Sequence, residues 1–318
     1  MAATWAIDAY DFYKPAGLWP VVAGGVSVAT YLRGLDATYA GVMAKLDAAK
    51  RRAGGGGASS SSSSRPPAPS SLADVDHIVL HAPYGKLLRK AFARLPAADA
   101  RRAAAAAAGR PPPGPGPGEG YDEKQAVADT EAAFEGVVGP SAWLAKNVGN
   151  MYTASLFASL LALVEDRGTA LDGTRILLYA FGSGAVASLF SVRARAGSGR
   201  FTLAALAASL TMRQRLASRR KAPPAELAAC LALAEARWCA AGWAPAAGST
   251  RVEPGAFYLV GVDAAWRRSY ARAPGGEGGG GGGGAPLAVR APPPRGDSPR
   301  AATPAAAAAD LESVLSAG

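Results

Sequence analysis

Asp76-His77-Ile78-Val79-Leu80-His81-Ala82-Pro83-Tyr84-Gly85-Lys86-Leu87-Leu88-Arg89-Lys90 joins a short apolar run to an amphipathic one. The run from Ile78 to Leu80 predicts a buried strand. Pro83 ends that strand because proline has no N–H to donate to a sheet, and Gly85 permits a tight turn. Residues 86–95 have helical spacing, with an apolar face made of Leu87, Leu88, Ala91 and Leu95. This order indicates a sheet covered by helices, an α/β fold.

The only two histidines of the 318 residues, His77 and His81, flank this strand. His81 lies where the strand ends and the loop begins, which is where open α/β sheets carry their chemistry. Lys86 and Lys90 are one helical turn apart and point the same way. An imidazole beside two lysines suits an acid/base group next to a phosphorylated substrate. The alternative is a structural histidine beside a solvated helix face, and we expect His77 to be structural.

Composition limits the classes of function. The net charge is +10, but many arginines lie in linkers, and no basic helix interleaved with aromatic residues indicates a nucleic-acid module. An anionic small ligand is the more economical partner. No apolar run reaches the length of a membrane span, and the first residues lack the pattern of a secretory signal.

The two cysteines, Cys230 and Cys239, lie in an alanine-rich stretch that is expected to be helical, and both are expected in its core. Two cysteines make no disulfide framework, which fits a reducing compartment, and we expect a cytoplasmic protein. No metal-ligand spacing is present, so no metal site is predicted.

Three biased tracts interrupt the chain. Residues 53–71 are rich in Gly, Ser and Pro and predict a flexible insert, and residues 96–120 predict a spacer. Residues 274–318 predict a disordered tail with a transient helix at 304–316. We therefore expect one domain over residues 1–273, followed by the tail.

The remaining elements follow from periodicity. No strand is expected ahead of Trp5. Helices are predicted after Tyr31, from Asp122 to Val137, from Leu156 to Val164 and within 201–243, and strands are predicted at 175–180 and 257–262. The Asn147 to Ser155 tract predicts a turn whose polar side chains either cap the next helix or contact a ligand.

Gly182-Ser183-Gly184 follows the strand at 175–180 and precedes Ala185 to Phe190, which we expect to begin a helix. This order resembles a nucleophile elbow, but Phe181 stands where that motif needs glycine. Two interpretations stay open: a tight turn with helix capping, or N–H groups and Ser183 cradling a substrate oxygen.

Five tracts, taken together, resemble hydroxymethylglutaryl-CoA synthase over residues 8–50 and 72–273. They are Tyr10-Asp11-Phe12-Tyr13-Lys14-Pro15, His81-Ala82-Pro83-Tyr84-Gly85-Lys86-Leu87, Gly149-Asn150-Met151-Tyr152-Thr153, Tyr179-Ala180-Phe181-Gly182-Ser183-Gly184, and Phe257-Tyr258-Leu259-Val260 with Arg267-Arg268-Ser269-Tyr270-Ala271-Arg272. The resemblance implies the carboxy-terminal half of a thiolase-like fold, a mixed sheet flanked by helices.

The resemblance also implies a reaction: acetyl-CoA, acetoacetyl-CoA and water give hydroxymethylglutaryl-CoA on the mevalonate route to isoprenoids. A cysteine carries the acetyl group, a glutamate forms the carbanion, and the residue matching His81 protonates the ketone oxygen. The matches to Lys86 and Lys90 lie near CoA, and those to Asn150 and Ser183 contact the acyl chain. Tyr10 and Asp11 match a loop near the active site.

The family's cysteine and glutamate have no match here, so the resemblance implies a half that is inactive alone. It implies no cofactor beyond the two CoA substrates, a homodimer for the complete enzyme, and neither nucleic-acid nor membrane partners. A second hypothesis is a non-catalytic acyl-CoA-binding or scaffolding protein. A serine hydrolase using Ser183 and His81, and a basic nucleic-acid binder, are both disfavoured.

Overall fold

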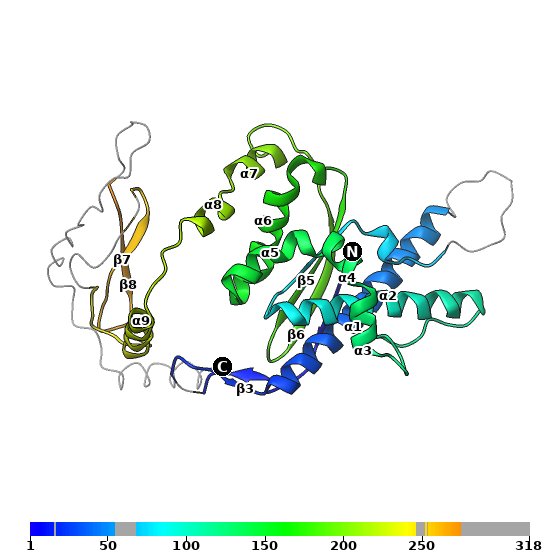
Figure 1. Ribbon diagram of the computed structural model, residues 1–318, viewed down its shortest axis with the longest axis horizontal. Helices are drawn as coiled ribbons and strands as arrows, with labels where there is room; N and C mark the ends of the chain where they lie inside the picture. Colours follow the sequence, from blue (N-terminus) through cyan, green and yellow to red (C-terminus); the bar gives the residue numbers. More distant parts are fainter. Residues whose placement is uncertain (16, 55–67, 246–251, 253, 275–318) are drawn as a thin grey trace, which may run out of the picture. The chain divides into compact units, whose positions relative to one another are not determined.

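The computed structural model describes residues 1–318 except 16, 55–67, 246–251, 253 and 275–318 (Figure 1). It divides into two compact units, Met1–Lys221 and Ala222–Gly318, which we describe separately. Most of the predicted flexible insert and nearly all of the predicted tail, with its helix at 304–316, lie outside the described residues. The single domain expected over residues 1–273 stays a prediction.

The first unit contains both strands and helices. Its strands are β1 (Ala2–Ala6), β2 (Phe12–Tyr13), β3 (Val21–Val22), β4 (His77–Leu80), β5 (Arg175–Gly182) and β6 (Val186–Arg193). Its α-helices are α1 (Gly24–Gly54), α2 (Gly85–Ala107), α3 (Glu123–Asp129), α4 (Glu131–Val137), α5 (Gly139–Val148), α6 (Ser155–Arg167), α7 (Leu203–Ser209) and α8 (Met212–Ala217). Short 3₁₀ turns are η1 (Leu72–Asp74), η2 (Tyr152–Ala154) and η3 (Gly168–Leu171).

Four strands form a mixed sheet in the order β1-β6-β5-β4. β4 runs parallel to β5, with Leu80 opposite Tyr179, while β6 is antiparallel to both of its neighbours. β2 and β3 form a separate two-stranded hairpin. The predicted strands at 78–80 and 175–180 are confirmed, as is the mixed sheet flanked by helices.

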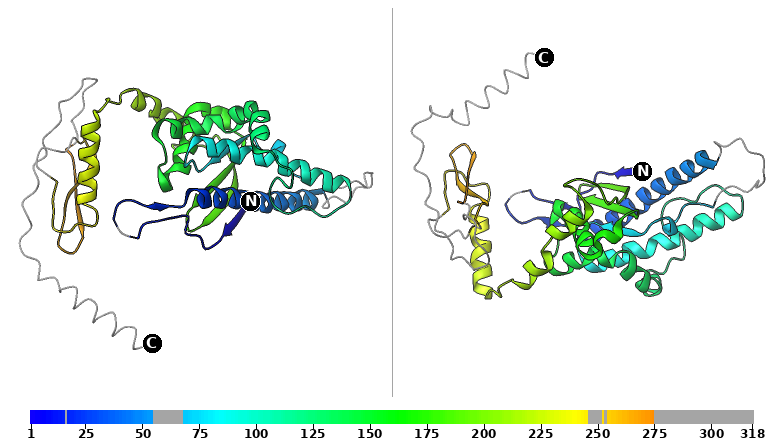
Figure 2. Two further views of the ribbon diagram at one scale, coloured as in Figure 1. Left: turned by 60° about the horizontal axis from the view of Figure 1, so that its bottom comes forward. Right: turned by 90° about the horizontal axis from the view of Figure 1, so that it is seen from above.

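The sheet has a helical layer on each face, because successive side chains of a strand point to opposite sides. Leu177 and Tyr179 of β5 pack with α1 and α2 in one core cluster, whereas Ile176 and Leu178 pack with α6 in another. In Figure 2, α1 and α6 lie on opposite sides of the strands. Both faces are buried, which explains why β5 reads as an uninterrupted apolar run.

The helix expected from Ala185 to Phe190 is wrong, because these residues belong to β6. Each residue of β5 pairs with a residue of β6 in the antiparallel sense, from Gly182 opposite Val186 to Arg175 opposite Arg193. Ala187 and Leu189 are buried while Val186 is exposed, which is the period of a strand. A short apolar run fits either element by composition, and pairing with β5 favours the strand.

The first residues and the first helix also differ from the prediction. β1 pairs with β6 along Ala2–Ala6, so a strand does precede and include Trp5. α1 begins at Gly24 rather than after Tyr31, because the N–H of Ser27 already donates to the carbonyl of Ala23 at 2.9 Å. The cavity described below is lined by the first two turns of this helix.

α2 confirms the helix predicted from Lys86 to Leu95 and continues to Ala107, so residues 96–107 are not a spacer. Pro96 lies inside the helix, where it removes one backbone hydrogen bond. The alanines that follow have the highest helix propensity, which favours continuation. The single helix predicted from Asp122 to Val137 is divided at Thr130 into α3 and α4.

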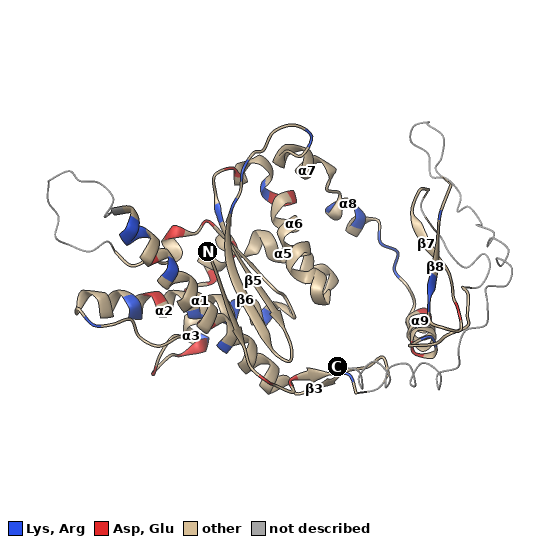
Figure 3. Cartoon of the chain, turned by 180° about the vertical axis from the view of Figure 1, so that it is seen from behind, with Lys and Arg blue, Asp and Glu red and all other residues tan. Residues whose placement is uncertain are grey.

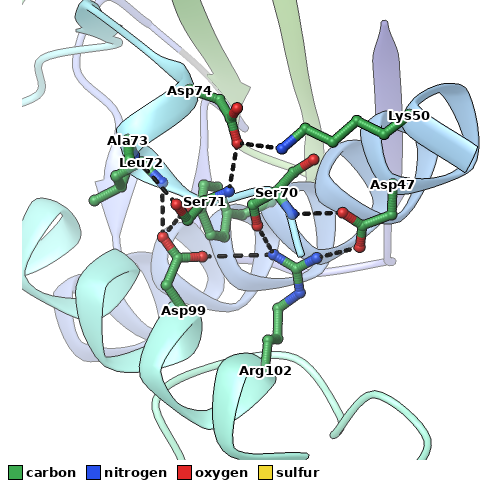
Figure 4. A network of polar contacts seen from close by, with 10 residues as sticks. Asp47, Lys50, Ser70, Ser71, Leu72, Ala73, Asp74, Asp99 and Arg102 are labelled. Carbon is green, nitrogen blue, oxygen red and sulfur yellow. Dashed lines mark hydrogen bonds and ion pairs between the residues drawn. The ribbon is translucent and has the colours of Figure 1, made fainter. Parts of the chain in front are cut away.

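A half-buried network of ion pairs and hydrogen bonds fixes the chain after residues 55–67, which are not described (Figure 4). Arg102 of α2 donates to the Ser70 carbonyl and to Asp47 of α1, both at 2.6 Å. Asp47 also accepts from the N–H of Ser70, and Asp99 accepts from the N–H of Leu72. Residues 70–72, at the end of the predicted flexible insert, are therefore anchored.

The second unit contains α9 (Pro224–Ala236) and the antiparallel pair β7 (Phe257–Val262) and β8 (Arg268–Arg272). The strand predicted at 257–262 is confirmed. Cys230 and Cys239 are free and exposed, so their expected place in a helix core is wrong. Alanine-rich composition favours a helix but does not specify which faces are covered.

Within the described ranges, we find no helix whose length and apolar character would let it cross a bilayer.

Candidate active site

A cavity of about 440 Å³ opens in the first unit between the start of α1, the β2–β3 hairpin, the loop after β4, η2 and the β5–β6 turn. Its lining consists of Phe12, Val22, Gly24, Ser27, Val28, Tyr31, His81, Pro83, Tyr84, Leu87, Asn150, Tyr152, Thr153, Phe181, Gly182 and Ser183. Three predicted site residues, His81, Asn150 and Ser183, thus meet in one mostly apolar cavity. This composition is typical of small-molecule sites.

His81 is fixed by its backbone and free at its imidazole. Its N–H donates to the carbonyl of Tyr179 at 2.8 Å, and its carbonyl accepts from the Tyr31 hydroxyl at 2.8 Å. The residue is 9% exposed, and no hydrogen bond within the described residues engages its imidazole. Burial lowers the pKa of His81 below its usual value. The ring is therefore neutral near pH 7, with one N–H donor and one acceptor available to a ligand.

Asn150 combines a structural and an available group. Its Oδ1 accepts from the N–H of Tyr152 at 2.8 Å and from the Ser155 hydroxyl at 3.1 Å. These bonds hold Tyr152 at a φ of +52°, which non-glycine residues rarely adopt. The Nδ2 of Asn150 has no partner among the described residues and can donate to a ligand.

Ser183 lies in the turn between two strands, not at the start of a helix. It is exposed, and its hydroxyl has no hydrogen bond within the described part of the chain. No bond joins it to His81 in the described residues, so the arrangement of a serine hydrolase is not formed. The predicted tight turn is confirmed and the helix capping expected with it is wrong, while a contact of Ser183 with a substrate oxygen stays a prediction.

Asp11 lies outside the cavity lining and holds the turn that follows Ser183. Its side chain is fully buried, and its Oδ1 accepts from the N–H of Gly184 at 2.9 Å. Asp11 does not line the cavity, and neither does Tyr10, which is 75% exposed and packs edge-on against Tyr13. The structure thus separates the two residues of this loop that were predicted together.

Lys86 and Lys90 differ in their surroundings. Lys86 is exposed, whereas the Nζ of Lys90 lies 2.6 Å from Glu123 of α3. The hydrogen bond to Glu123 raises the pKa of Lys90. Figure 3 shows the acidic and basic residues of this region gathered on α1, α2 and α3. Neither lysine lines the cavity, although both belong to the helix that begins at its edge.

Sequence reasoning missed several aromatic residues of the cavity wall, including Phe12, Tyr31, Tyr152 and Phe181. Tyr31 had a usable signal, because it precedes Leu35 and Tyr39 at helical spacing and so belongs to the same helix face. The other three come from different elements. Only the tertiary fold brings them together.

The cavity lining contains no cysteine, aspartate, glutamate, lysine or arginine in the described residues. Its titratable groups are His81 and three tyrosines. Throughout the described ranges, no group of three or more His, Cys, Asp or Glu is placed to hold a metal ion. The chemistry that the cavity itself offers is hydrogen bonding and proton transfer at one imidazole.

A mixed sheet between two helical layers, with His81 in a cavity at the end of its strands, agrees with the thiolase-like class of protein that the resemblance implies. Residues 1–110 and 119–273 match the family model described as hydroxymethylglutaryl-coenzyme A synthase C terminal. The chain therefore belongs to the hydroxymethylglutaryl-CoA synthase family, and the predicted resemblance and fold are confirmed.

Comparison with individual proteins gives the same family. The chain is 36% identical over 282 residues to the hydroxymethylglutaryl-CoA synthase of Ganoderma lucidum and 32% identical to the mitochondrial one of Mus musculus. Each match covers 84% of this chain, but 56% and 53% of the respective relative. The solved structure of MvaS in complex with 3-hydroxy-3-methylglutaryl coenzyme A is 26% identical with a TM-score of 0.61, and covers 86% of this chain and 56% of that one. The chain thus spans about half the length of the relatives that it matches.

Proposed function

We propose that this chain supplies the acid/base half of a hydroxymethylglutaryl-CoA synthase, which condenses acetyl-CoA with acetoacetyl-CoA and releases the product with water. The observation that carries this proposal is the buried imidazole of His81, which has no hydrogen-bond partner among the described residues and lies in the cavity that also contains Asn150 and Ser183. This is the arrangement that a group acting on an acyl oxygen needs.

His81 would act first as a donor. Its neutral ring donates one N–H to the ketone oxygen of acetoacetyl-CoA, where negative charge develops as the carbon–carbon bond forms. That alkoxide needs a proton, and a negative charge beside the imidazole favours the protonated ring. The ring takes up this proton from solvent as the charge develops, and the resulting imidazolium delivers it to the alkoxide and returns to the neutral form. General acid catalysis of this kind contributes about 10²–10⁴-fold.

The nucleophile and the base would come from outside this cavity lining. A thiolate must carry the acetyl group, and a carboxylate must remove a proton from its methyl carbon. The two cysteines, Cys230 and Cys239, have neither a histidine nor a helix start beside them in sequence to activate a thiol. We therefore propose that the chain alone is inactive.

Asn150 and Ser183 would contact the acyl chain, and Lys86 and Lys90 the anionic part of CoA. The two CoA esters are substrates, and no other cofactor is proposed. A homodimer of the complete enzyme and a cytoplasmic location stay predictions.

The test combines two measurements on purified residues 1–318. Isothermal titration should detect binding of acetoacetyl-CoA, and incubation with both substrates should give no hydroxymethylglutaryl-CoA. Adding the amino-terminal half of the Ganoderma lucidum relative should restore product. His81→Ala should then lower condensation by about 10²–10⁴-fold while acetylation of the added cysteine continues. Condensation that is unchanged by His81→Ala contradicts the proposal.

The second candidate is a non-catalytic acyl-CoA-binding or scaffolding protein, which the lack of a cysteine or glutamate in the cavity lining favours. It predicts binding of acetoacetyl-CoA without any product in the mixture of halves. Product formed by residues 1–318 alone, and lost on changing Cys230 or Cys239, would contradict both candidates.

A further inference from the structure

We infer that Tyr31 and Tyr179 are positioning residues that hold His81 for catalysis. The catalytic meaning of this inference rests on the proposed function, whereas the structural connection does not. The Tyr31 hydroxyl donates to the His81 carbonyl, the Tyr179 hydroxyl donates to the Tyr31 carbonyl, and the His81 N–H donates to the Tyr179 carbonyl. Each of the three distances is 2.8 Å.

These bonds form a closed connection among three elements. Tyr31 comes from α1, Tyr179 from β5 and His81 from the end of β4, and each residue is bonded to the other two. The sheet register reinforces the connection, because β4 and β5 are paired up to Leu80 opposite Tyr179. A shift of His81 along the sheet would therefore break bonds to both tyrosines.

The two phenols lie in the core, where an unpaired hydroxyl is costly. Tyr31 is 1% exposed and Tyr179 is 0% exposed, and their rings meet edge-on at 5.1 Å. Burial raises the pKa of both, so they stay protonated donors at any physiological pH. A buried polar group left unpaired loses its contacts with water without replacement, which favours the bonded arrangement.

The connection fixes the backbone of His81 on both sides, so the imidazole keeps only its own side-chain torsions. A general acid must lie within about 2.6–3.2 Å of the atom that it protonates. A misplacement of about 1 Å can cost about 100-fold in rate. Without the Tyr31 hydroxyl, the loop after β4 can shift and water can reach the imidazole.

The pKa of the His81 imidazole reports on this positioning, because few other titratable groups lie close enough to shift it. The cavity lining has no charged side chain in the described residues, and its other titratable groups are Tyr31, Tyr84 and Tyr152. The pKa of His81 is lowered by burial. A looser, wetter ring should therefore titrate closer to the ordinary histidine value of about 6.5.

The experiment is an NMR titration of the full chain labelled at histidine, which gives two imidazole signals that His77→Gln assigns. Tyr31→Phe should raise the pKa of His81 toward its ordinary value and leave His77 unchanged. Tyr39→Phe is the matched control, since Tyr39 is buried on the same helix and its hydroxyl donates to Asp99 at 2.8 Å. A His81 pKa that is unchanged in Tyr31→Phe, or equally shifted in Tyr39→Phe, overturns the inference.

Tyr179→Phe removes the next bond of the connection and provides a second variant should Tyr31→Phe not fold. It should shift His81 in the same direction, and an unshifted His81 there counts against the inference. In the two-half mixture, Tyr31→Phe should lower kcat by about 10- to 100-fold with little change in KM. If the wild-type mixture makes no product, the proposed function fails, but the NMR result still decides the positioning.

Discussion

Asp11 and Gly184 are joined by a hydrogen bond of 2.9 Å from the Gly184 N–H to the Asp11 carboxylate, across 173 positions of sequence. The bond ties the loop before β2 to the turn that carries Ser183. Two further backbone bonds run alongside it, from Ala9 to the Gly184 carbonyl and from Ile7 to the Ala185 carbonyl. Residues 7–11 therefore hold the turn that carries Ser183, although of residues 7–12 Phe12 alone lines the cavity.

We predict that Asp11→Ala lowers the free energy of unfolding by about 1–3 kcal/mol, because the half-buried hydrogen bond from the Gly184 N–H to a charged acceptor is lost. Asp11→Asn is the control, since its amide oxygen can still accept that bond, and it should be closer to wild type. Urea unfolding followed by circular dichroism measures both. Equal stability of Asp11→Ala and wild type would show that the bond contributes nothing.

Lys86 and Lys90 should not contribute equally to CoA binding. Lys90 is paired with Glu123 at 2.6 Å, and a phosphate must compete with this carboxylate, whereas Lys86 is exposed. Lys86→Ala should therefore weaken acetoacetyl-CoA binding several-fold and Lys90→Ala less, in line with about 0–1 kcal/mol for an exposed ion pair.

Glu123→Gln tests the same idea in the opposite direction. It frees Lys90 and should tighten acetoacetyl-CoA binding, and the gain should shrink at high salt because exposed charges are screened. Isothermal titration at low and high salt measures both effects. Unchanged affinity in Glu123→Gln and a larger loss in Lys90→Ala than in Lys86→Ala would reverse the assignment.

A helix or strand was predictable where its hydrophobic periodicity identifies it without knowledge of its neighbours in the fold. The apolar face of α2 and the run in β5 gave a helix and a strand from sequence alone. Ala185 to Phe190 did not, because a short apolar run fits both elements until its partner strand is known. Residues 96–107 differ in the other direction, since their biased composition predicted a spacer, whereas α2 continues through Pro96 to Ala107.

Three residues of the candidate cavity were predictable from the sequence, whereas the contacts that connect them to the rest of the fold were not. His81, Asn150 and Ser183 were assigned by resemblance, and the cavity brings them together. Pairing of Lys90 with Glu123 joins positions that are far apart in sequence, and no pattern along the chain specifies it. The same holds for the bond from Tyr31 to His81. Such pairs depend on how α1 and α2 pack, which a single sequence read for periodicity does not determine.

The glycines of α1 allow a test of packing against the sheet. A Cβ added at Gly34 would lie 2.8 Å from the Cβ of Ala187 and 2.9 Å from the Tyr179 hydroxyl, whereas a Cβ at Gly25 meets nothing within 4 Å. Gly34→Ala should therefore destabilise the protein by about 1–3 kcal/mol through overpacking.

Gly25→Ala, on the same helix, should stabilise the protein by about 0.4–1 kcal/mol, because it restricts the unfolded chain without a clash. Thermal and urea unfolding of both variants measure the difference. If Gly34→Ala is as stable as Gly25→Ala, α1 does not pack closely on β5 and β6 as described.

The two histidines should make stability depend on pH in a defined direction. Burial lowers the pKa of His81, and burial followed by the charge of Arg167 lowers the pKa of His77. The unfolded chain, with an ordinary pKa of about 6.5, then binds protons that the folded chain does not. Stability is thus fully present above pH 6.5 and is lost as pH falls from there toward the lower folded values.

We therefore predict that the free energy of unfolding of the wild type decreases as the pH falls from 7.5 to 5.5. A double variant that carries both His77→Gln and His81→Gln should lose much of this decrease. Glutamine does not titrate, so the difference between the two proteins isolates the histidines from other groups. Asp99, whose pKa is raised by burial, acts in the opposite direction at lower pH and is unchanged in both proteins. Urea midpoints measured at several pH values give the two profiles. Parallel profiles would mean that the fold lowers the pKa of neither imidazole, which would contradict the effect of burial assigned to His81.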